Sequence, residues 1–218
     1  MKTNINKIIK QTTAYTLTTL LVFTVLFTSF EPVYLRAQTA SSSITVTLNV
    51  DAGIAINEPS NVTMSPNISL TQHSSIGNQT WNVKTNAPSG YTLTLRASTT
   101  PAMQQSAAPN DFFEDYQTSN PNTWNVSSGT KAFGYSAYGN DVSTSVWGTG
   151  SSCGSAGTPS GTLNYLGFTT SDYVVATNSS TTTFAGTNTI VCFAAQQNNI
   201  FATAGTYTAD IIATATVQ

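Results

Sequence analysis

Carboxylates are the side chains of this sequence best suited to chemistry. Asp111, Glu114 and Asp115 lie within one short stretch, and Asp141 follows downstream. Several carboxylate oxygens together can bind Ca²⁺, and two carboxylates flanking a sugar bond are the acid and base of a glycosidase. The spacing does not match an EF-hand loop, and acidic residues in loops are more commonly solvated. We therefore expect no catalytic residue and no metal ligand, and keep calcium binding and glycoside hydrolysis as alternatives.

The other reactive or ligand-binding side chains do not form a recognisable motif. His73 is the only histidine and lies beside two serines in a turn-rich segment, so a catalytic triad would depend on this one residue. Aromatic side chains could form a platform for a sugar ring, but they more often anchor the core of a sandwich. The aromatic residues in question are Phe112, Phe113, Tyr116, Trp124 and Trp147. We expect no cofactor and a protein that is not an enzyme.

Cys153 and Cys192 are the only two cysteines of the chain. In an exported protein, two cysteines most simply form one disulfide. Zinc is the other use of such a pair, but two thiols and a single histidine fall short of a closed tetrahedral ligand set. We therefore predict a disulfide between Cys153 and Cys192.

The N-terminal segment has the layout of a signal peptide. Three lysines lie in the first ten residues, an uncharged apolar run extends from about residue 13 to 30, and small residues surround Ala37. We predict a signal peptide over residues 1–37 and a mature protein that is secreted or held at the cell surface, outside the membrane. An uncleaved membrane anchor is the alternative.

The charge of the remaining chain excludes two classes of partner. Residues 38–218 contain three lysines and arginines against eight acidic residues, a difference of five. Binding to nucleic acid requires a basic surface that displaces counterions, and a polybasic membrane patch requires the same residues. We therefore expect neither partner. Serine, threonine and asparagine must keep the protein soluble, a composition typical of extracellular β-proteins.

Alternating hydrophobic residues predict an all-β fold. Around the turn-rich residues 86–90, Trp81 and Val83 alternate with polar residues on one side, and Tyr91, Leu93 and Leu95 do so on the other. A period of two places such side chains on one face of a strand, and two strands joined by a short turn suggest a hairpin. Further short strands follow, separated by glycine, proline and asparagine. We predict one antiparallel, immunoglobulin-like β-sandwich over residues 38–218.

Two further segments carry specific expectations. Residues 99–131 contain three prolines and form either a mobile loop or a connection that holds short strands. Residues 44–51 are the most regular alternation in the chain, with Ile44, Val46, Leu48 and Val50 on one face. Ala52 and Gly53 follow as a hinge. We predict that residues 44–51 fill a groove in the sandwich, either as an edge strand of their own copy or, as we favour, as a donor strand in a neighbouring copy.

Taken together, these segments resemble the spore coat protein U type of secreted domain, the module of archaic chaperone–usher pilus subunits. The similarity rests on the opening ITVTLNV (44–50), on GYTLTLRASTTPAM (90–103), on FGYSAYGNDVSTSVWGTG (133–150) and on the ending AGTYTADIIATATVQ (204–218). The cysteines lie at other positions than in that family.

The resemblance implies a structural subunit of a surface fibre or pilus that associates with itself, or with another surface subunit, by β-strand addition. A stand-alone surface adhesin or carbohydrate-binding sandwich is the alternative. In that case the first strand would stay in its own sandwich.

Overall fold

The computed structural model describes residues 12–24, 40–107, 110–116 and 119–218, which fall into two compact units, Met1–Asn49 and Val50–Gln218. In the first unit, residues 12–24 are helical. Most of the predicted signal peptide, including its cleavage site, lies outside the described residues. Among the helices of the described ranges, none is long and apolar enough to cross a membrane.

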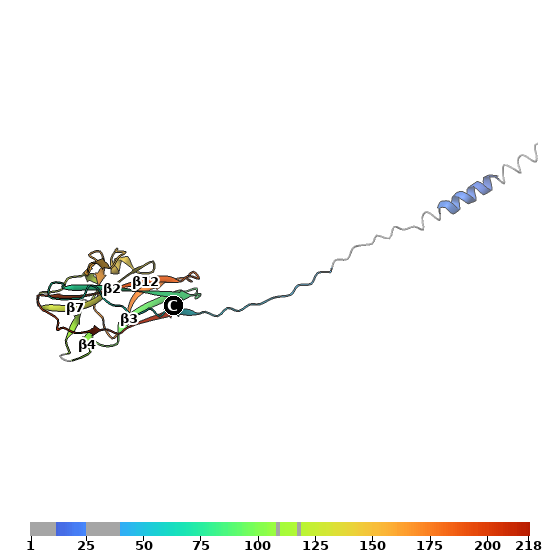
Figure 1. The fold of residues 1–218 in the computed structure, drawn as a ribbon. Helices are drawn as coiled ribbons and strands as arrows, with labels where there is room; N and C mark the ends of the chain where they lie inside the picture. Colours follow the sequence, from blue (N-terminus) through green and yellow to red (C-terminus); the bar gives the residue numbers. More distant parts are fainter. Residues whose placement is uncertain (1–11, 25–39, 108–109, 117–118) are drawn as a thin grey trace, which may run out of the picture. The chain divides into compact units, whose positions relative to one another are not determined.

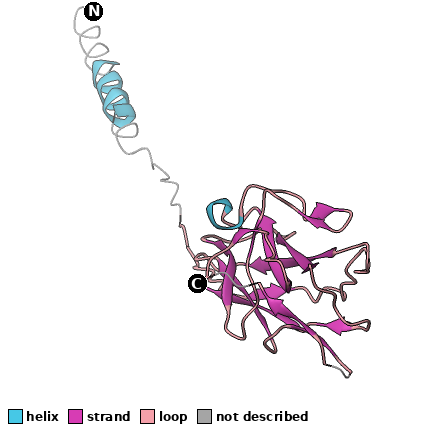
Figure 2. Ribbon diagram, turned by 90° about the vertical axis from the view of Figure 1, so that its left-hand side faces the viewer, coloured by secondary structure: helices cyan, strands magenta, loops and turns pink. Residues whose placement is uncertain are grey.

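The second unit consists of two main sheets (Figures 1 and 2). The larger sheet contains, in spatial order, β1 (Ile54–Ile56), β2 (Ser74–Thr85), β12 (Thr187–Asn198), β7 (Thr130–Gly139), β5 (Phe112–Asp115), β4 (Met103–Gln105) and β13 (Tyr207–Thr208). The smaller sheet contains β11 (Tyr173–Asn178), β3 (Tyr91–Ala97) and β14 (Ile211–Val217). Within these two sheets all pairs are antiparallel except β5 with β7. The prediction of an antiparallel β-sandwich is confirmed.

Short elements complete the unit. Two small ladders pair β6 (Asn122–Thr123) with β10 (Asn164–Tyr165), and β8 (Gly154–Ser155) with β9 (Thr158–Pro159). A single helical turn, α2 (Thr144–Trp147), buries Trp147. The segment 99–131, which we expected to be either a loop or a set of short strands, therefore contains β4, β5 and β6 and is built into the sheets.

The predicted hairpin over residues 80–96 is wrong in its pairing, although both strands exist. β2 pairs with β12 over ten residues and β3 pairs with β14 over seven, so the turn at residues 86–90 crosses from one sheet to the other. The physical reason is burial. Val83 on β2 and Leu93 on β3 are both fully buried, and each sheet covers the apolar face of the other.

The main core lies between the two sheets. Phe133, Tyr135 and Phe168 stack in its centre, with ring centroids of Tyr135 and Phe168 4.2 Å apart. The two sheets join at a corner, where the chain passes from β3 in the smaller sheet to β4 in the larger one. Nearby it returns from β13 in the larger sheet to β14 in the smaller one. Ser98 N–H donates to the Asp210 carbonyl (2.9 Å) at that corner and keeps the two segments paired.

A second cluster covers the outer face of the larger sheet. Its side chains come from β7 and β12, from the segment before β7, and from residues 148–166 after β7, which we call the outer excursion. They are Tyr116, Val126, Ala132, Cys153, Leu163, Tyr165, Cys192 and Ala194. β12 is therefore buried on both faces, with Val191 and Phe193 in the main core and Cys192 and Ala194 in the outer cluster. Such two-sided burial explains why this strand is a continuous apolar run rather than an alternation.

The surroundings of Gly134 on β7 show how closely the residues of the second cluster approach the larger sheet. A Cβ atom at this position would lie 2.7 Å from the carbonyl oxygen of Leu166 and 2.9 Å from Cβ of Tyr116. We expect Gly134→Ala to lower the free energy of unfolding by about 1–3 kcal/mol, because the backbone must move to admit the methyl group. Denaturant titration followed by tryptophan fluorescence measures this.

Gly161→Ala is the matched control, since nothing lies within 4 Å of a Cβ atom built at that position. Its unfolding free energy should stay within about 0.5 kcal/mol of the parent protein. Equal stabilities of the two variants would contradict the close packing of the outer layer on β7.

Candidate strand-exchange site

β14 is an edge strand whose inward face is only partly covered. One side of β14 pairs with β3 along its whole length, and the strand ends the order of its sheet. Ile211, Ala213 and Ala215 pack against the main core but remain partly exposed. An edge strand presents N–H and C=O groups that can pair with another chain. Backbone groups and apolar surface are thus both available along β14.

β1 lies opposite this edge and is too short to cover it. β1 spans three residues, pairs with β2 and contacts β14. Its side chains Ile54 and Ile56 are also only partly buried against the core. We call the strip between β1 and β14 the open seam. Both sheets of the sandwich thus end in partly exposed apolar side chains along the open seam.

The predicted exchange residues are exposed and belong to no strand. Ile44, Val46, Leu48 and Val50 are 85%, 84%, 84% and 75% exposed, and residues 40–53 have no regular secondary structure. Four large apolar side chains in strict alternation therefore face solvent in the single chain. Exposed apolar surface of this extent marks a segment that binds something else.

Asn86 fixes the chain where this segment meets the sandwich. Its side-chain amide donates to the carbonyl of Asp51 (2.9 Å), and its Oδ1 accepts from the N–H of Gly53 (2.6 Å). Thr85 adds a bond from its hydroxyl to the carbonyl of Gly53 (2.8 Å). The predicted hinge at Ala52 and Gly53 is thus held on both sides at the turn after β2. We call this end of the sandwich the tether end.

A partly buried ion pair anchors the strand that leads into β14. Lys131 on β7 donates to the carboxylate of Asp111, and the same carboxylate accepts from the hydroxyl of Tyr207 (2.7 Å) and the N–H of Thr203 (2.8 Å). The side chains of Lys131 and Asp111 are 13% and 18% exposed. β13 and the loop before it are therefore tied, within the larger sheet, to β7 and to the residue that precedes β5.

The pKa of the Asp111 carboxyl group reflects this network. Burial alone would raise the pKa, but the bonds from Lys131, from the Thr203 N–H and from Tyr207 outweigh burial and hold it well below its usual range. The same carboxylate, together with burial, raises the pKa of the Tyr207 hydroxyl. The negative charge of Asp111 is therefore stabilised by folding.

The remaining acidic residues have separate structural partners. Asp115 is 7% exposed and accepts bonds from the Thr100 hydroxyl (2.8 Å) and the Ala102 N–H (3.1 Å), and burial raises its pKa. Within the described ranges, no group of three or more histidine, cysteine, aspartate and glutamate side chains lies close enough to hold a metal ion. The structure therefore does not bring Asp111, Glu114, Asp115 and Asp141 together into one site.

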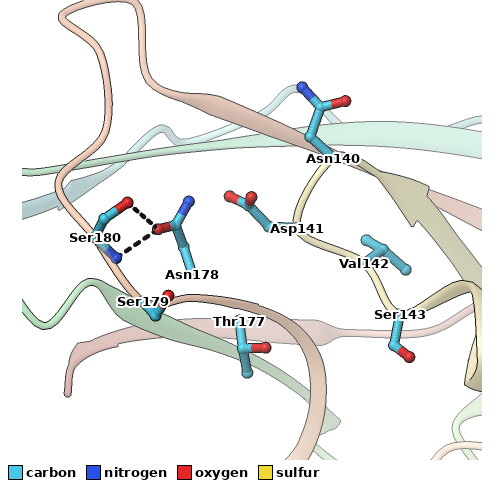
Figure 3. A pocket seen from close by; sticks show the side chains of 8 residues that line it. All are labelled: Asn140, Asp141, Val142, Ser143, Thr177, Asn178, Ser179 and Ser180. Carbon is cyan, nitrogen blue, oxygen red and sulfur yellow. Dashed lines mark hydrogen bonds between the residues drawn. The ribbon is translucent and has the colours of Figure 1, made fainter.

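Asp141 lines a polar depression of about 450 Å³ at the loops after β7 and β11. Figure 3 shows its carboxylate facing the side chain of Asn178 across this depression, and Asn178 accepts bonds from the N–H (2.8 Å) and hydroxyl (3.1 Å) of Ser180. Tyr91 donates its hydroxyl to Asp141 (2.7 Å), and burial, with the nearby carboxylate, raises the pKa of Tyr91. The depression is shallow and its wall is polar.

The five aromatic residues considered for a sugar platform separate into different places. Phe113 and Trp147 are buried in the main core, whereas Tyr116 stacks on Trp124 (4.6 Å) in the outer cluster. Phe112 is 38% exposed at the sheet edge. These five residues therefore do not form one platform for a sugar ring. His73 lies near Phe201, with ring centroids 6.5 Å apart.

The predicted disulfide between Cys153 and Cys192 is confirmed. It joins β12 to the outer excursion, with a Cα–Cα distance of 5.2 Å and 39 residues of sequence separation. Both cysteines are buried in the outer cluster. The bond therefore secures the outer layer and lies on the face of the sheet away from the main core.

Sequence reasoning missed Asn86 and the network around Asp111. Asn86 belongs to a turn-rich stretch that fits any tight turn, and its partners lie 33 and 35 positions away. Tyr207 is 96 positions from Asp111. A signal that could have found the pair is the single lysine between residues 97 and 218, because a buried cation needs an acidic partner.

Replacement of Asp111 tests the anchor of β13. A carboxylate whose pKa is lowered by folding adds stability above its unfolded pKa near 4, and this stability is lost as the pH falls. We expect Asp111→Asn to lower the unfolding free energy at pH 7 by about 2–3 kcal/mol. Urea titrations from pH 7 to pH 2 should show the difference from the parent protein narrowing below pH 4.

Asp172→Asn is the matched control, because its ion pair with Arg96 is long (3.6 Å) and exposed. Its effect should stay below about 1 kcal/mol at every pH. A difference for Asp111→Asn that does not depend on pH would contradict the role of the charge.

Comparison with known proteins finds no match for this chain, whether with family models, with curated proteins or with solved structures. The arrangement of its own residues is therefore the basis for any functional conclusion. That arrangement is a disulfide-linked sandwich with an open seam beside β14 and an exposed, alternating apolar segment before β1.

Proposed function

We propose that this protein is an exported, non-enzymatic subunit of a surface fibre or pilus. Residues 44–50 of one copy pair with β14 of another copy and fill its open seam. The observation that supports this best is the coexistence of an exposed strand-like sequence and an edge strand of matching length. Both span seven residues, and each carries four apolar side chains at alternate positions. The proposal agrees with the family that the sequence resembles.

The side chains of the two segments are complementary in size. β14 presents the small side chains Ala213 and Ala215 in its middle, and both are only partly buried. Val46 and Leu48 occupy the middle of the exposed segment in either direction of pairing. Burying a valine or leucine contributes about 1.5–3 kcal/mol each, and the paired backbone of an edge strand adds affinity. Thr45 and Thr47 would then continue the threonine-rich outer face of β3 and β14.

A disulfide and the scarcity of charge fit a protein that works outside the cell. Disulfides persist in oxidising compartments such as the periplasm and the cell surface. The Cys153–Cys192 bond would persist in such a compartment and stabilise the subunit there. Secretion or display at the cell surface is therefore part of the proposal.

A stand-alone adhesin or carbohydrate-binding module is the second candidate. The polar depression at Asp141, Asn140 and Asn178 favours it, because hydroxyl-rich ligands are held by carboxylate and amide groups. In such a protein residues 44–50 would stay in their own sandwich instead of entering a neighbouring copy. A monomeric protein that binds glycans through this depression would support the second candidate over the first.

Leu48→Asp tests strand donation directly. An aspartate at this inward position would bury an unpaired charge in the seam, which is strongly unfavourable. We expect the exported variant to lose self-assembly at least tenfold, as seen by SDS-resistant ladders in unheated samples. Its own β14 is unchanged, so it should still join the end of a wild-type chain once, which a fluorescent label on the variant detects.

Thr47→Asp is the matched control, since Thr47 alternates to the outer face and its replacement should leave the ladder intact. Unchanged assembly of Leu48→Asp would contradict donation through this face. A wild-type protein that is folded and strictly monomeric would refute the proposal as a whole.

A further inference from the structure

The end of the sandwich opposite the tether end carries an exposed apolar patch. Leu70, Ile200 and Phe201 are 73%, 42% and 59% exposed, and we call them the far-end patch. Gln197, which is almost fully buried, holds the two segments of the patch together. It donates its side-chain amide to the carbonyl of Ser69 (2.8 Å) and accepts from the N–H of Ala202 (2.9 Å). The patch is therefore a built feature of two joined loops.

The tether end carries an exposed aromatic residue of its own. Phe184, in the connection between β11 and β12, is fully exposed. Thr182 in the same connection donates its N–H to the carbonyl of Thr85 (3.0 Å), beside Asn86. Large apolar side chains are thus exposed at both ends of the sandwich.

The length of the tether brings neighbouring copies into contact if residues 44–50 are donated as proposed. Only three residues separate Val50 from the start of β1 at Ile54, and Asn86 holds two of them to their own sandwich. A chain spans at most about 3.3–3.6 Å per residue, so Val50 lies within about 14 Å of Ile54. The sandwich that receives Val50 must therefore touch the tether end of the donor.

The donated segment could enter the seam from either end of β14. Ile211 lies at the far end and Val217 at the tether end, because they pair with Ala97 and Tyr91 of β3. Entry beside Val217 would place two tether ends face to face in a closed, reciprocal dimer, whose far-end patches stay exposed. Entry beside Ile211 places a tether end on a far end, which generates an open chain and covers a patch at each junction.

We infer that the far-end patch is the docking surface for the tether end of the next copy of this chain. Phe184 of the donor packs against Leu70, Ile200 and Phe201 of the acceptor, and the donated segment runs antiparallel to β14. This inference rests on the proposed strand donation and adds a second contact to each junction. Each junction then buries apolar surface at the sandwich ends as well as along the seam.

Site-specific photocrosslinking in the assembled full-length protein tests this contact. We place p-benzoylphenylalanine at position 201 and mix equal amounts of light and isotopically labelled chains before irradiation. The expected product is a mixed-isotope crosslink between position 201 of one copy and residues 182–186 of another. Phe184→Ser should lower the yield of this crosslink at least fivefold.

Position 174 provides the control, because Val174 is similarly exposed (46%) but lies on β11, between the two ends. The crosslinker there should give no such product, and Val174→Ser should leave the yield at position 201 unchanged. Assembled protein that crosslinks 201 to 201, or that gives no product between position 201 and residues 182–186, would overturn the docking while leaving strand donation intact. A protein that never assembles would overturn strand donation and the docking together.

Discussion

Burial of β12 on both faces is the constraint on which the rest of this sandwich depends. The strand pairs with β2 on one side and β7 on the other, each over ten residues. Val191 and Phe193 supply the main core, whereas Cys192 and Ala194 require a second cover on the opposite face. The outer excursion and its disulfide exist to meet that requirement. One central strand thus organises three layers.

β14 differs from β12 in how completely its apolar side chains are covered. Its inward face carries apolar residues, as that of β12 does, but only one of its edges is paired and its core contacts are incomplete. The Asp111–Lys131–Tyr207 network fixes the chain just before it, and the bond from Ser89 to the terminal Gln218 fixes the chain just after it. A rigid strand with a free edge is pre-organised for pairing, since little further ordering is needed when a partner arrives.

The sequence predicted faces of strands better than their partners. Alternation correctly placed Tyr91, Leu93 and Leu95 in the core, because a period of two decides which side chains share a face. Alternation carries no information about which strand lies alongside, so β2 and β3 could not be assigned to different sheets. The disulfide followed from two cysteines in a chain predicted to be exported, with too few other ligands for zinc.

The strands β4 and β5 were missed as definite elements for a related reason. They are three and four residues long and pair over two positions at the sheet edge, too short for a periodic signal. The role of Asn86 was not predicted, because its two hydrogen bonds join segments more than thirty positions apart. In the candidate site, the exposed alternation at 44–50 was visible in the sequence, whereas the open seam is a property of the packed sheets.

The clamp at Asn86 has a mechanical consequence for a fibre joined in the proposed way. Tension would enter each sandwich at Asp51 and leave it through β14, near the opposite edge of the seam. Strands that lie side by side along the direction of pull resist shearing with all their hydrogen bonds at once. The outer layer, with its disulfide, lies away from that line of force. Stretching would therefore load the hydrogen bonds of the β1–β2 and β3–β14 ladders first. The Cys153–Cys192 disulfide would carry little of the tension.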